Sequence, residues 1–326
     1  MRLIAFTDLH VHNYKNFDRN GSRLEQCLKV LEDVFKFAHK NKIDYILFGG
    51  DIVDQQQAVP TAAGNALMQK LSFLFTNYRD IKIIAITGNH DQATKSVFTA
   101  PGVSFLTQLD IAFAERFILI DNAWFEIEST IIHGIPYYQH PEHFKKALEI
   151  TAGRVNATQA YKHVLMIHQT PSGLGNPNIP IDTDVNDPLY DNFDLIICGH
   201  IHRKQEITDK FFLLGSPLHR DLGDEGDEKG FWVFDTDEPA GTMTFITRKG
   251  RYPEFKRMKG VITTEMSEKD YIIPEIEISE ISEIGATEME NFNASLKPSE
   301  LLENFYNEVH GKDKKLLQTG LEFVTI

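Results

Sequence analysis

Polar residues of the kinds that bind divalent metals follow five apolar runs along the 326-residue chain. Each motif stands where a predicted strand ends, and ligand sites in open α/β sheets gather at the carboxyl ends of strands. The motifs are Asp8-Leu9-His10, Gly50-Asp51-Ile52-Val53-Asp54, Gly88-Asn89-His90-Asp91, His168 and Gly199-His200-Ile201-His202. Carboxylates, an amide and imidazoles suit Mn²⁺, Fe or Zn²⁺ better than ions that prefer all-oxygen shells. We therefore predict a metal centre built from these motifs.

A centre with two ions needs one carboxylate that both can share. Ions held about 3.5 to 4 Å apart lower the pKa of a bridging water from about 15.7 toward neutrality and neutralise charge on a phosphoryl group. Asp51 is the candidate for the bridge. Each motif alone is a weak signal, because Asp-Leu-His is usually a polar strand end and Gly-Asn-His-Asp a turn. Their order and spacing together favour the metal centre.

The elements that would position these motifs are short apolar strands alternating with amphipathic helices, a pattern typical of a layered α/β fold. Apolar residues at helical spacing predict helices over residues 22–40 and 62–75. Strands are expected over residues 2–7, 45–48, 82–87, 117–120, 130–135, 164–167, 195–198, 211–214, 231–235, 242–247 and 272–278.

The five motifs, in this order, resemble the calcineurin-like metallophosphoesterases, whose pattern is D-x-H, GDxxD, GNHD, H and GHxH. The resemblance implies a sandwich of two mixed sheets flanked by helices and two divalent ions, Mn²⁺ first, with Mg²⁺, Fe or Zn²⁺ as alternatives. One ion would be held by Asp8, His10 and His202. The other would be held by Asn89, His168 and His200, with Asp51 shared.

The same resemblance assigns roles to the residues beside the ligands. His90 would contact the scissile phosphate and protonate the leaving oxygen, and Asp91 would orient His90. Asp54 would contact the metal ligands without binding an ion itself. Gln55 stands where the protein serine/threonine phosphatases carry an arginine, which counts against a phosphoprotein substrate.

Two further segments are similar to the SbcD-type nucleases of this family. They are His133-Gly134-Ile135-Pro136-Tyr137, and Leu214-Gly215-Ser216-Pro217 followed by Arg220 and residues 224–231. The resemblance implies a hydrolase that cleaves DNA with Mn²⁺, as a 3′ to 5′ exonuclease and single-strand endonuclease. Such proteins work in DNA repair and recombination with an SbcC-like coiled-coil ATPase, and a homodimer is expected.

The resemblance also divides the chain into three parts. A nuclease domain would cover residues 1–242, a small α+β capping segment residues 243–285, and a C-terminal helical segment residues 286–326. The last segment would bind the ATPase through an apolar face, although packing against its own core is an equally open interpretation. The apolar residues of that face are Leu301, Leu302, Phe305, Tyr306 and Val309.

Composition limits the partners and the location. The net charge of −14 counts against DNA binding, because phosphate contacts normally come from basic surfaces. Residues 261–326 carry 14 acidic and 5 basic residues, however, and bound cations would neutralise several of the remaining carboxylates. Cys27 and Cys198 form no paired motif, which favours a reducing cytoplasm. No apolar window is long enough to predict a membrane span.

Two alternative functions stay open at this point. One is a stand-alone phosphodiesterase for small or cyclic nucleotides, and the other is a DNA-end scaffold without catalysis, which the full ligand set disfavours. Tyr137 and Tyr138 lie in a predicted loop and are candidates for contact with DNA. The acidic run 221–228 is expected to be a solvated or metal-proximal turn.

Overall fold

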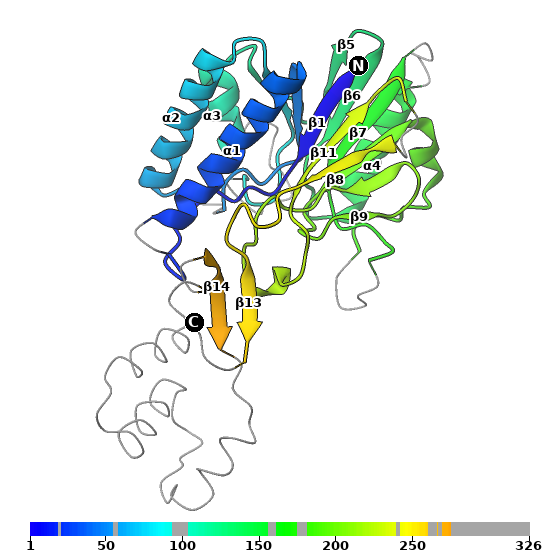
Figure 1. Ribbon diagram of the computed structural model, residues 1–326. Coiled ribbons are helices and arrows are strands. Elements are labelled where there is room, and N and C mark those ends of the chain that lie inside the picture. Colours follow the sequence, from blue (N-terminus) through cyan, green and yellow to red (C-terminus); the bar gives the residue numbers. More distant parts are fainter. Residues whose placement is uncertain are drawn as a thin grey trace, which may run out of the picture. The chain divides into compact units, whose positions relative to one another are not determined.

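Two six-stranded mixed sheets and the helices that cover them dominate the computed structural model (Figure 1). The structure describes residues 1–18, 21–54, 58–92, 104–155, 161–174, 181–238, 242–259, 266 and 269–274. The chain divides into two units, Met1–Lys256 with Thr263–Ile272, and Arg257–Ile262 with Ile273–Ile326. Gln55 and the predicted helical segment 286–326 lie outside the described residues.

The first sheet has the strand order β12-β11-β1-β2-β3-β4. Its strands are β1 (Arg2–Phe6), β2 (Tyr45–Phe48), β3 (Lys82–Ala85), β4 (Phe117–Leu119), β11 (Gly230–Asp235) and β12 (Thr244–Thr247). β1 to β4 run parallel, and β11 and β12 are antiparallel to their neighbours. The register pairs Ile4 with Ile46 and Ile46 with Ile83, so β1, β2 and β3 end at the same edge of the sheet.

The second sheet has the order β5-β6-β7-β8-β10-β9. Its strands are β5 (Trp124–Ile127), β6 (Thr130–Ile135), β7 (Lys162–His168), β8 (Leu195–Gly199), β9 (Gln205–Glu206) and β10 (Phe211–Leu213). β6, β7, β8 and β10 run parallel. The register pairs His168 with Gly199, so the ends of β7 and β8 lie side by side.

Apolar clusters on both faces of the first sheet explain why its strands are continuous hydrophobic runs. Successive side chains of a strand point to opposite faces. Leu3 and Ala5 of β1 therefore belong to the cluster shared with Met166 and Ile197 of the second sheet. Ile4 and Phe6 face the other way. The two sheets are thus packed against each other through one common core.

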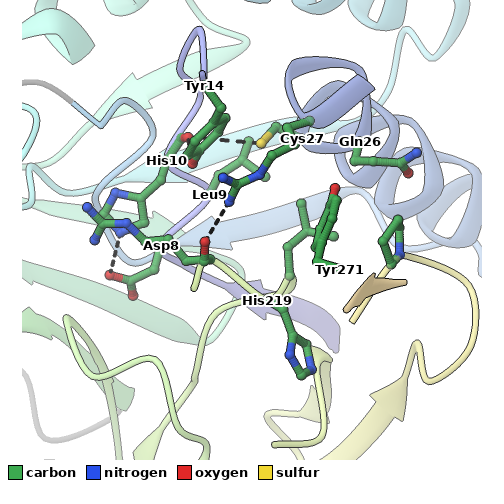
Figure 2. Close-up of a pocket in the computed structure, with 12 residues that line it drawn as sticks. Asp8, Leu9, His10, Tyr14, Gln26, Cys27, His219 and Tyr271 are labelled. Atoms are coloured by element: carbon green, nitrogen blue, oxygen red, sulfur yellow. Dashed lines mark hydrogen bonds and ion pairs between the residues drawn. The ribbon is translucent and has the colours of Figure 1, made fainter. Parts of the chain in front are cut away.

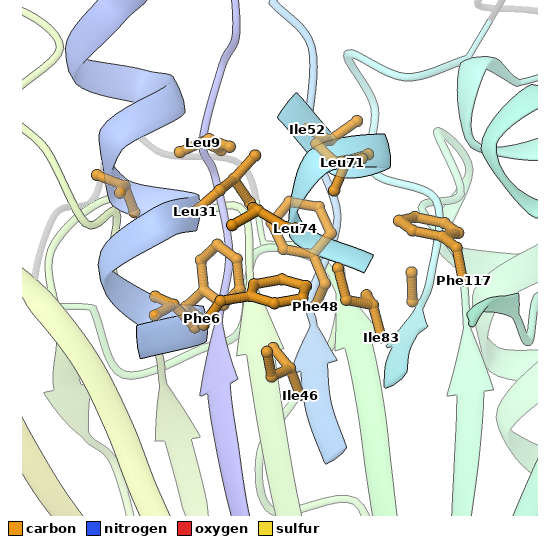
Figure 3. Packing of buried hydrophobic residues seen from close by; sticks show 14 of the residues in the cluster. Phe6, Leu9, Leu31, Ile46, Phe48, Ile52, Leu71, Leu74, Ile83 and Phe117 are labelled. Atoms are coloured by element: carbon orange, nitrogen blue, oxygen red, sulfur yellow. The ribbon is translucent and has the colours of Figure 1, made fainter. Parts of the chain in front are cut away.

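Helices cover the outer faces of both sheets. α1 (Ser22–Asn41), α2 (Thr61–Asn77) and α3 (Phe105–Ala112) share a core with the first sheet, and α4 (Pro141–Val155) shares one with the second. Figure 3 shows Phe6 and Phe48 of the sheet packed beside Leu31 of α1 and Leu74 of α2. Each such side chain stabilises the fold by about 1.5 to 3 kcal/mol relative to leaving it exposed.

The predicted α/β sandwich of two mixed sheets flanked by helices is confirmed. Both predicted helices and the predicted strands of the two sheets are present, with ends shifted by one or two residues. In the two sheets and the helices that cover them, α3, α4, β5 and β9 were not predicted. α3 buries only Leu106 and Leu109, and β5 only Ile127, which is too few apolar positions for a clear period.

The predicted capping segment, residues 243–285, starts inside the first sheet. β12 pairs with β11 there, and the first unit extends to Lys256. Further along the chain, β13 (Phe255–Met258) and β14 (Tyr271–Pro274) form a two-stranded sheet. The remainder of residues 243–285 is described only in part, and the division into nuclease domain and capping segment stays a prediction.

Neither membrane insertion nor disulfide bonding is indicated by the described residues. None of the helices described here combines the length and the hydropathy of a bilayer span. Cys27 and Cys198 are both buried and free.

Two buried histidines lie side by side in the second sheet. Nε2 of His133 in β6 is 2.9 Å from Nδ1 of His163 in β7, and the two residues are 2% and 3% exposed. Burial, and then the neighbouring His163, lower the pKa of His133 from 6.5 to about 4. The neutral form of His133 therefore stabilises the fold.

We expect the contribution of His133 to the free energy of unfolding to fall as the pH drops from 6.5 toward 4. The unfolded chain takes up a proton at His133 in this range and the folded chain does not, so the loss at pH 5 is about 2 kcal/mol. Urea unfolding of the wild type and of His133→Gln at pH 7 and pH 5 measures it. The variant should lose less stability on acidification, and an equal loss in both proteins would contradict this assignment.

Candidate metal centre

The five motifs lie at or directly after the carboxyl ends of β1, β2, β3, β7 and β8, at the edge where the parallel strands end. Backbone hydrogen bonds join these loops. The N–H of Asp8 donates to Gly50 O (2.9 Å), and the N–H of His10 donates to Asp51 O (3.0 Å). Across the two sheets, the N–H of His200 donates to Asp8 Oδ2 (3.0 Å). All seven predicted ligands therefore lie in one connected site.

Asp8, His10 and His202 form the first ligand group. Nε2 of His10 and Nε2 of His202 are 3.1 Å apart, and they lie 3.7 and 3.8 Å from Asp8 Oδ1. Asp8 Oδ1 is buried and accepts no hydrogen bond from the described residues. An oxygen of this kind costs free energy unless a cation or donor satisfies it. The first group thus offers three converging donor atoms.

Asn89, His168 and His200 form the second ligand group. Asn89 Oδ1 is 3.1 Å from Nε2 of His168 and 2.8 Å from Nδ1 of His200. Nδ1 of His168 lies 2.7 Å from Gly49 O. Because a carbonyl oxygen only accepts, that nitrogen carries a hydrogen, and Nε2 is the ring nitrogen left to bind a metal once its own proton is displaced.

Asp51 lies between the two groups. Its Oδ2 is 3.8 Å from Nε2 of His10 in the first group and 3.3 Å from Nε2 of His168 in the second. The residue is 1% exposed. One carboxylate oxygen therefore faces both sets of donors, which is the arrangement that a bridging ligand requires.

Four of these residues adopt left-handed backbone conformations. The φ angles are 53° at Asp8, 49° at His10, 59° at Asp51 and 81° at His200. Each costs about 1 to 3 kcal/mol for a residue other than glycine. The surrounding hydrogen bonds between loops hold the chain in these conformations, which turn the side chains toward the centre.

Glycines beside the ligands leave room for them. A Cβ added to Gly88 would lie 2.2 Å from Asp51 Oδ1, and one added to Gly199 would lie 2.7 Å from Nδ1 of His168. Real Cβ atoms do not approach other atoms so closely. The absence of a side chain at these two positions is thus a condition for the ligand geometry.

His90 and Asp54 lie next to the first ligand group. Nδ1 of His90 is 2.6 Å from Asp54 O, and the His90 ring packs edge-on against His10 at 4.8 Å between centroids. Oδ1 of Asp54 lies 3.2 Å from Nδ1 of His10. Asp54 therefore orients both histidines, one through its carbonyl group and one through its carboxylate.

Asp91 does not contact the His90 ring in the described interactions. Its carboxylate instead accepts hydrogen bonds from the N–H groups of Asp51, Ile52, Val53 and Gly88, at 2.6 to 3.2 Å. Burial and the charge of Asp51 raise the pKa of Asp91 to about 7, although these N–H groups act to lower it. Asp91 thus holds the Asp51 loop, and its role in orienting His90 stays a prediction.

Arg220 is a contact that the sequence did not assign to the site. Nη2 of Arg220 is 2.7 Å from Asp54 Oδ1. Asp54, His10 and His90 have donor atoms close enough to hold an ion. Because the guanidinium already neutralises Asp54, however, that group is a poor third metal site. An isolated arginine after Pro217 gave no spacing from which this role could be inferred.

A small pocket opens beside the first ligand group (Figure 2). Figure 2 shows Asp8, His10, Tyr14 and Cys27 among the residues that line it. The hydroxyl group of Tyr14 donates to His10 O (2.6 Å). The guanidinium of Arg23 lies 3.9 Å from the centre of the Tyr14 ring. His10 is therefore held through its main chain as well as its ring.

The electrostatics of the centre suit bound cations. Burial lowers the pKa of His10, but Asp54 and Asp8 outweigh this effect and raise it to about 9. The pKa of His168 is likewise raised to about 9, against its burial, by the charge of Asp51. In contrast, burial and His168 lower the pKa of His200 to about 4. Protons on His10 and His168 balance the carboxylates, and cations that replace them satisfy the same charges.

The donor set therefore fits two divalent ions. Imidazole nitrogens, an amide oxygen and buried carboxylates are the ligands of a mixed nitrogen and oxygen site. His10 and His168 each direct Nδ1 toward an oxygen of the protein, and this leaves Nε2 toward the centre. The predicted ligands Asp8, His10, Asp51, Asn89, His168, His200 and His202 would hold the pair.

Known proteins of low identity match most of this chain. The chain is 24% identical over 257 residues to the DNA double-strand break repair protein Mre11 of Nanoarchaeum equitans, covering 72% of this chain and 66% of that protein. It is 23% identical over 314 residues to Mre11 of Methanocaldococcus jannaschii (93% and 74%). It is 22% identical over 269 residues to the SbcD component of the nuclease SbcCD of Staphylococcus saprophyticus (76% and 69%). The chain thus spans about two thirds to three quarters of each relative.

Gly88→Ala is expected to lower the Mn²⁺ stoichiometry below the wild-type value, because the added Cβ must displace Asp51, the ligand that both ions would share. Gly153→Ala in α4 is the matched control, since its Cβ would meet nothing within 4 Å and alanine stabilises a helix by about 0.5 to 1 kcal/mol relative to glycine. Mn²⁺ stoichiometry by calorimetry, with thermal unfolding alongside, tests both variants. Wild-type stoichiometry in Gly88→Ala would refute the steric argument.

The family assignment comes from a match over the part of the chain that holds the centre. The family model of the calcineurin-like phosphoesterases matches residues 1–204, more than half of the 326 residues. This range contains all seven converging side chains and His90. The metal-binding character of the site and the hydrolysis of phosphoesters follow from the same membership. The chain belongs to the calcineurin-like phosphoesterase family.

Proposed function

We propose that this chain is a Mn²⁺-dependent DNA nuclease, acting as a 3′ to 5′ exonuclease and single-strand endonuclease. The observation that carries the proposal is the position of Asp51, whose Oδ2 faces both His10 (3.8 Å) and His168 (3.3 Å). Two ions bound there would activate water and neutralise charge on a phosphoryl group. The choice of DNA is supported by the names of the relatives, the repair protein Mre11 and the nuclease SbcCD.

His90 is the residue best placed to act on the leaving group. Its Nδ1 carries the hydrogen that Asp54 O accepts, so Nε2 is the ring nitrogen left for the substrate. The His90 side chain is 25% exposed, whereas the His10 side chain is 3% exposed. A protonated His90 would donate from Nε2 to the leaving oxygen as the phosphorus–oxygen bond breaks. Asp54 keeps the ring in this orientation.

Tyr137 extends the site toward a polymeric substrate. Its ring is half-buried and lies 5.6 Å from the His200 ring at an interplanar angle of 35°. Tyrosine rings with one open face stack on nucleotide bases, and each stacked base contributes about 1 to 3 kcal/mol. A chain with a net charge of −14 attracts DNA only weakly, so most contacts between basic residues and the DNA phosphates would come from a partner.

That partner, in our proposal, is an SbcC-like coiled-coil ATPase that binds residues 286–326. Homodimerisation through α1 and α2 is a further prediction from the resemblance. A cytoplasmic location is a further prediction from the absence of a paired cysteine motif in the sequence. The described residues do not include 286–326, and the proposal for this segment rests on the apolar face seen in the sequence.

The purified chain is expected to cleave linear single- and double-stranded DNA with Mn²⁺ and to leave cyclic nucleotides intact. Chelation with EDTA should stop cleavage, and added Mn²⁺ should restore it. Hydrolysis of cyclic nucleotides without cleavage of DNA would place the chain among stand-alone phosphodiesterases. Two bound ions without any hydrolysis would instead identify a scaffold.

His90→Ala is expected to lower the rate of DNA cleavage by about 10² to 10⁴-fold, the range for loss of a general acid. Mn²⁺ stoichiometry should stay at the wild-type value, because His90 is not among the ligands. His140→Ala is the matched control, as the side chain of His140 is 41% exposed and lies outside the motifs. Single-turnover rates and calorimetry provide the two readings, and full activity in His90→Ala would remove it from the mechanism.

A further inference from the structure

The acidic turn before β11 contains a buried ion pair that the function described above does not use. Asp224 and Lys229 are 4% and 5% exposed, and Lys229 Nζ is 2.6 Å from Asp224 Oδ1. Burial acts to raise the pKa of Asp224, but the charge of Lys229 outweighs it and lowers the pKa below the ordinary value. Charged groups are rarely buried so completely, and this pair lies beside the metal centre.

Lys229 connects the pair to the first ligand group. Besides Asp224, Nζ donates to His202 O (2.9 Å) and to Ser216 Oγ (3.0 Å). All three hydrogens of the ammonium group are therefore used. Ser216 also donates its N–H to His202 O (3.0 Å). The main chain of a predicted ligand, His202, is thus fixed by two donors.

Asp224 connects the pair to the same group by a second route. Its Oδ2 accepts from the N–H of Arg220 (2.7 Å). Nη2 of Arg220 lies 2.7 Å from Asp54 Oδ1, and that oxygen lies 3.2 Å from Nδ1 of His10. One ion pair therefore positions both histidines of the first group. Lys229 donates to the carbonyl group of His202, and Asp224 is connected to the His10 ring through Arg220 and Asp54.

The second ligand group has separate support. His168 is anchored by Gly49 O at 2.7 Å and by Asn89 Oδ1 at 3.1 Å. Among the described interactions, neither Asp224 nor Lys229 contacts Asn89, His168 or His200. The ion pair thus acts on one side of the centre.

We infer that Asp224 and Lys229 are positioning residues for the first metal site, formed by Asp8, His10 and His202, and that they set its affinity without setting that of the second site. The inference rests on the proposed two-metal centre. Loss of a residue that hydrogen-bonds to a metal ligand typically weakens the affinity for the metal by about 10- to 100-fold. The expected effect of breaking the pair is therefore weaker binding of one ion of the two.

Mn²⁺ titration followed by calorimetry and electron paramagnetic resonance tests this inference. In Lys229→Met, one of the two ions should bind about 10- to 100-fold more weakly. Its spectrum should then show an isolated ion at concentrations where the wild type shows a spin-coupled pair, and it should match that of His202→Ala. The second affinity should stay at the wild-type value.

A double variant separates positioning from folding. Lys229→Met alone leaves a buried charge, whereas Lys229→Met with Asp224→Asn removes both charges and should recover much of the lost thermal stability. The double variant still lacks the hydrogen bond from Lys229 Nζ to His202 O, so its affinity for Mn²⁺ at the first site should stay below the wild-type value. Arg251→Met is the control, because it removes the ion pair with Asp33 of α1 and should keep both affinities.

The outcomes distinguish the inference from the function on which it rests. A wild type that does not bind two ions would overturn the proposed metal centre. Two ions in the wild type, with unchanged affinities in the folded Lys229→Met or double variant, would overturn the positioning role alone. Equal weakening of both sites would do the same, because it would indicate a general structural effect.

Discussion

The carboxylate of Asp51 is the group on which the rest of the site depends. Its Oδ2 faces both ligand groups, and its Oδ1 accepts the N–H of His90 (2.8 Å). Both main-chain polar groups of Asp51 are hydrogen-bonded as well. Its N–H donates to Asp91, and its carbonyl group accepts from the N–H of His10. A charge buried to this extent requires compensation from every side. The surrounding histidines and the predicted cations provide it.

Holding that carboxylate in place has a conformational cost. The backbone is left-handed at four residues, Asp8, His10, Asp51 and His200, and each of these conformations costs about 1 to 3 kcal/mol. Strands that end side by side hold the loops in these conformations. The common core between the sheets brings the ends of β1, β2 and β3 to those of β7 and β8. The burial of apolar side chains therefore stabilises strained loops that would not keep their shape alone.

The two halves of the centre are supported differently. The second ligand group lies on β3, β7 and β8 and is anchored by a carbonyl group and an amide. The first depends on longer side-chain connections through Asp54 and Arg220. Connections between flexible side chains are easier to alter than backbone contacts.

The sequence by itself pointed to the candidate ligands, because each motif directly follows a strand that can be recognised from a local apolar run, and the order of the motifs resembles that of a known family. The local apolar runs also predicted a layered α/β fold, whereas the division into two mixed sheets came from the family resemblance. Only the tertiary structure decided which partner each side chain finds: Asp91 with the Asp51 loop, Arg220 with Asp54, and Lys229 with His202 O. These contacts join residues from 27 to 166 positions apart, and no local pattern encodes such a distance.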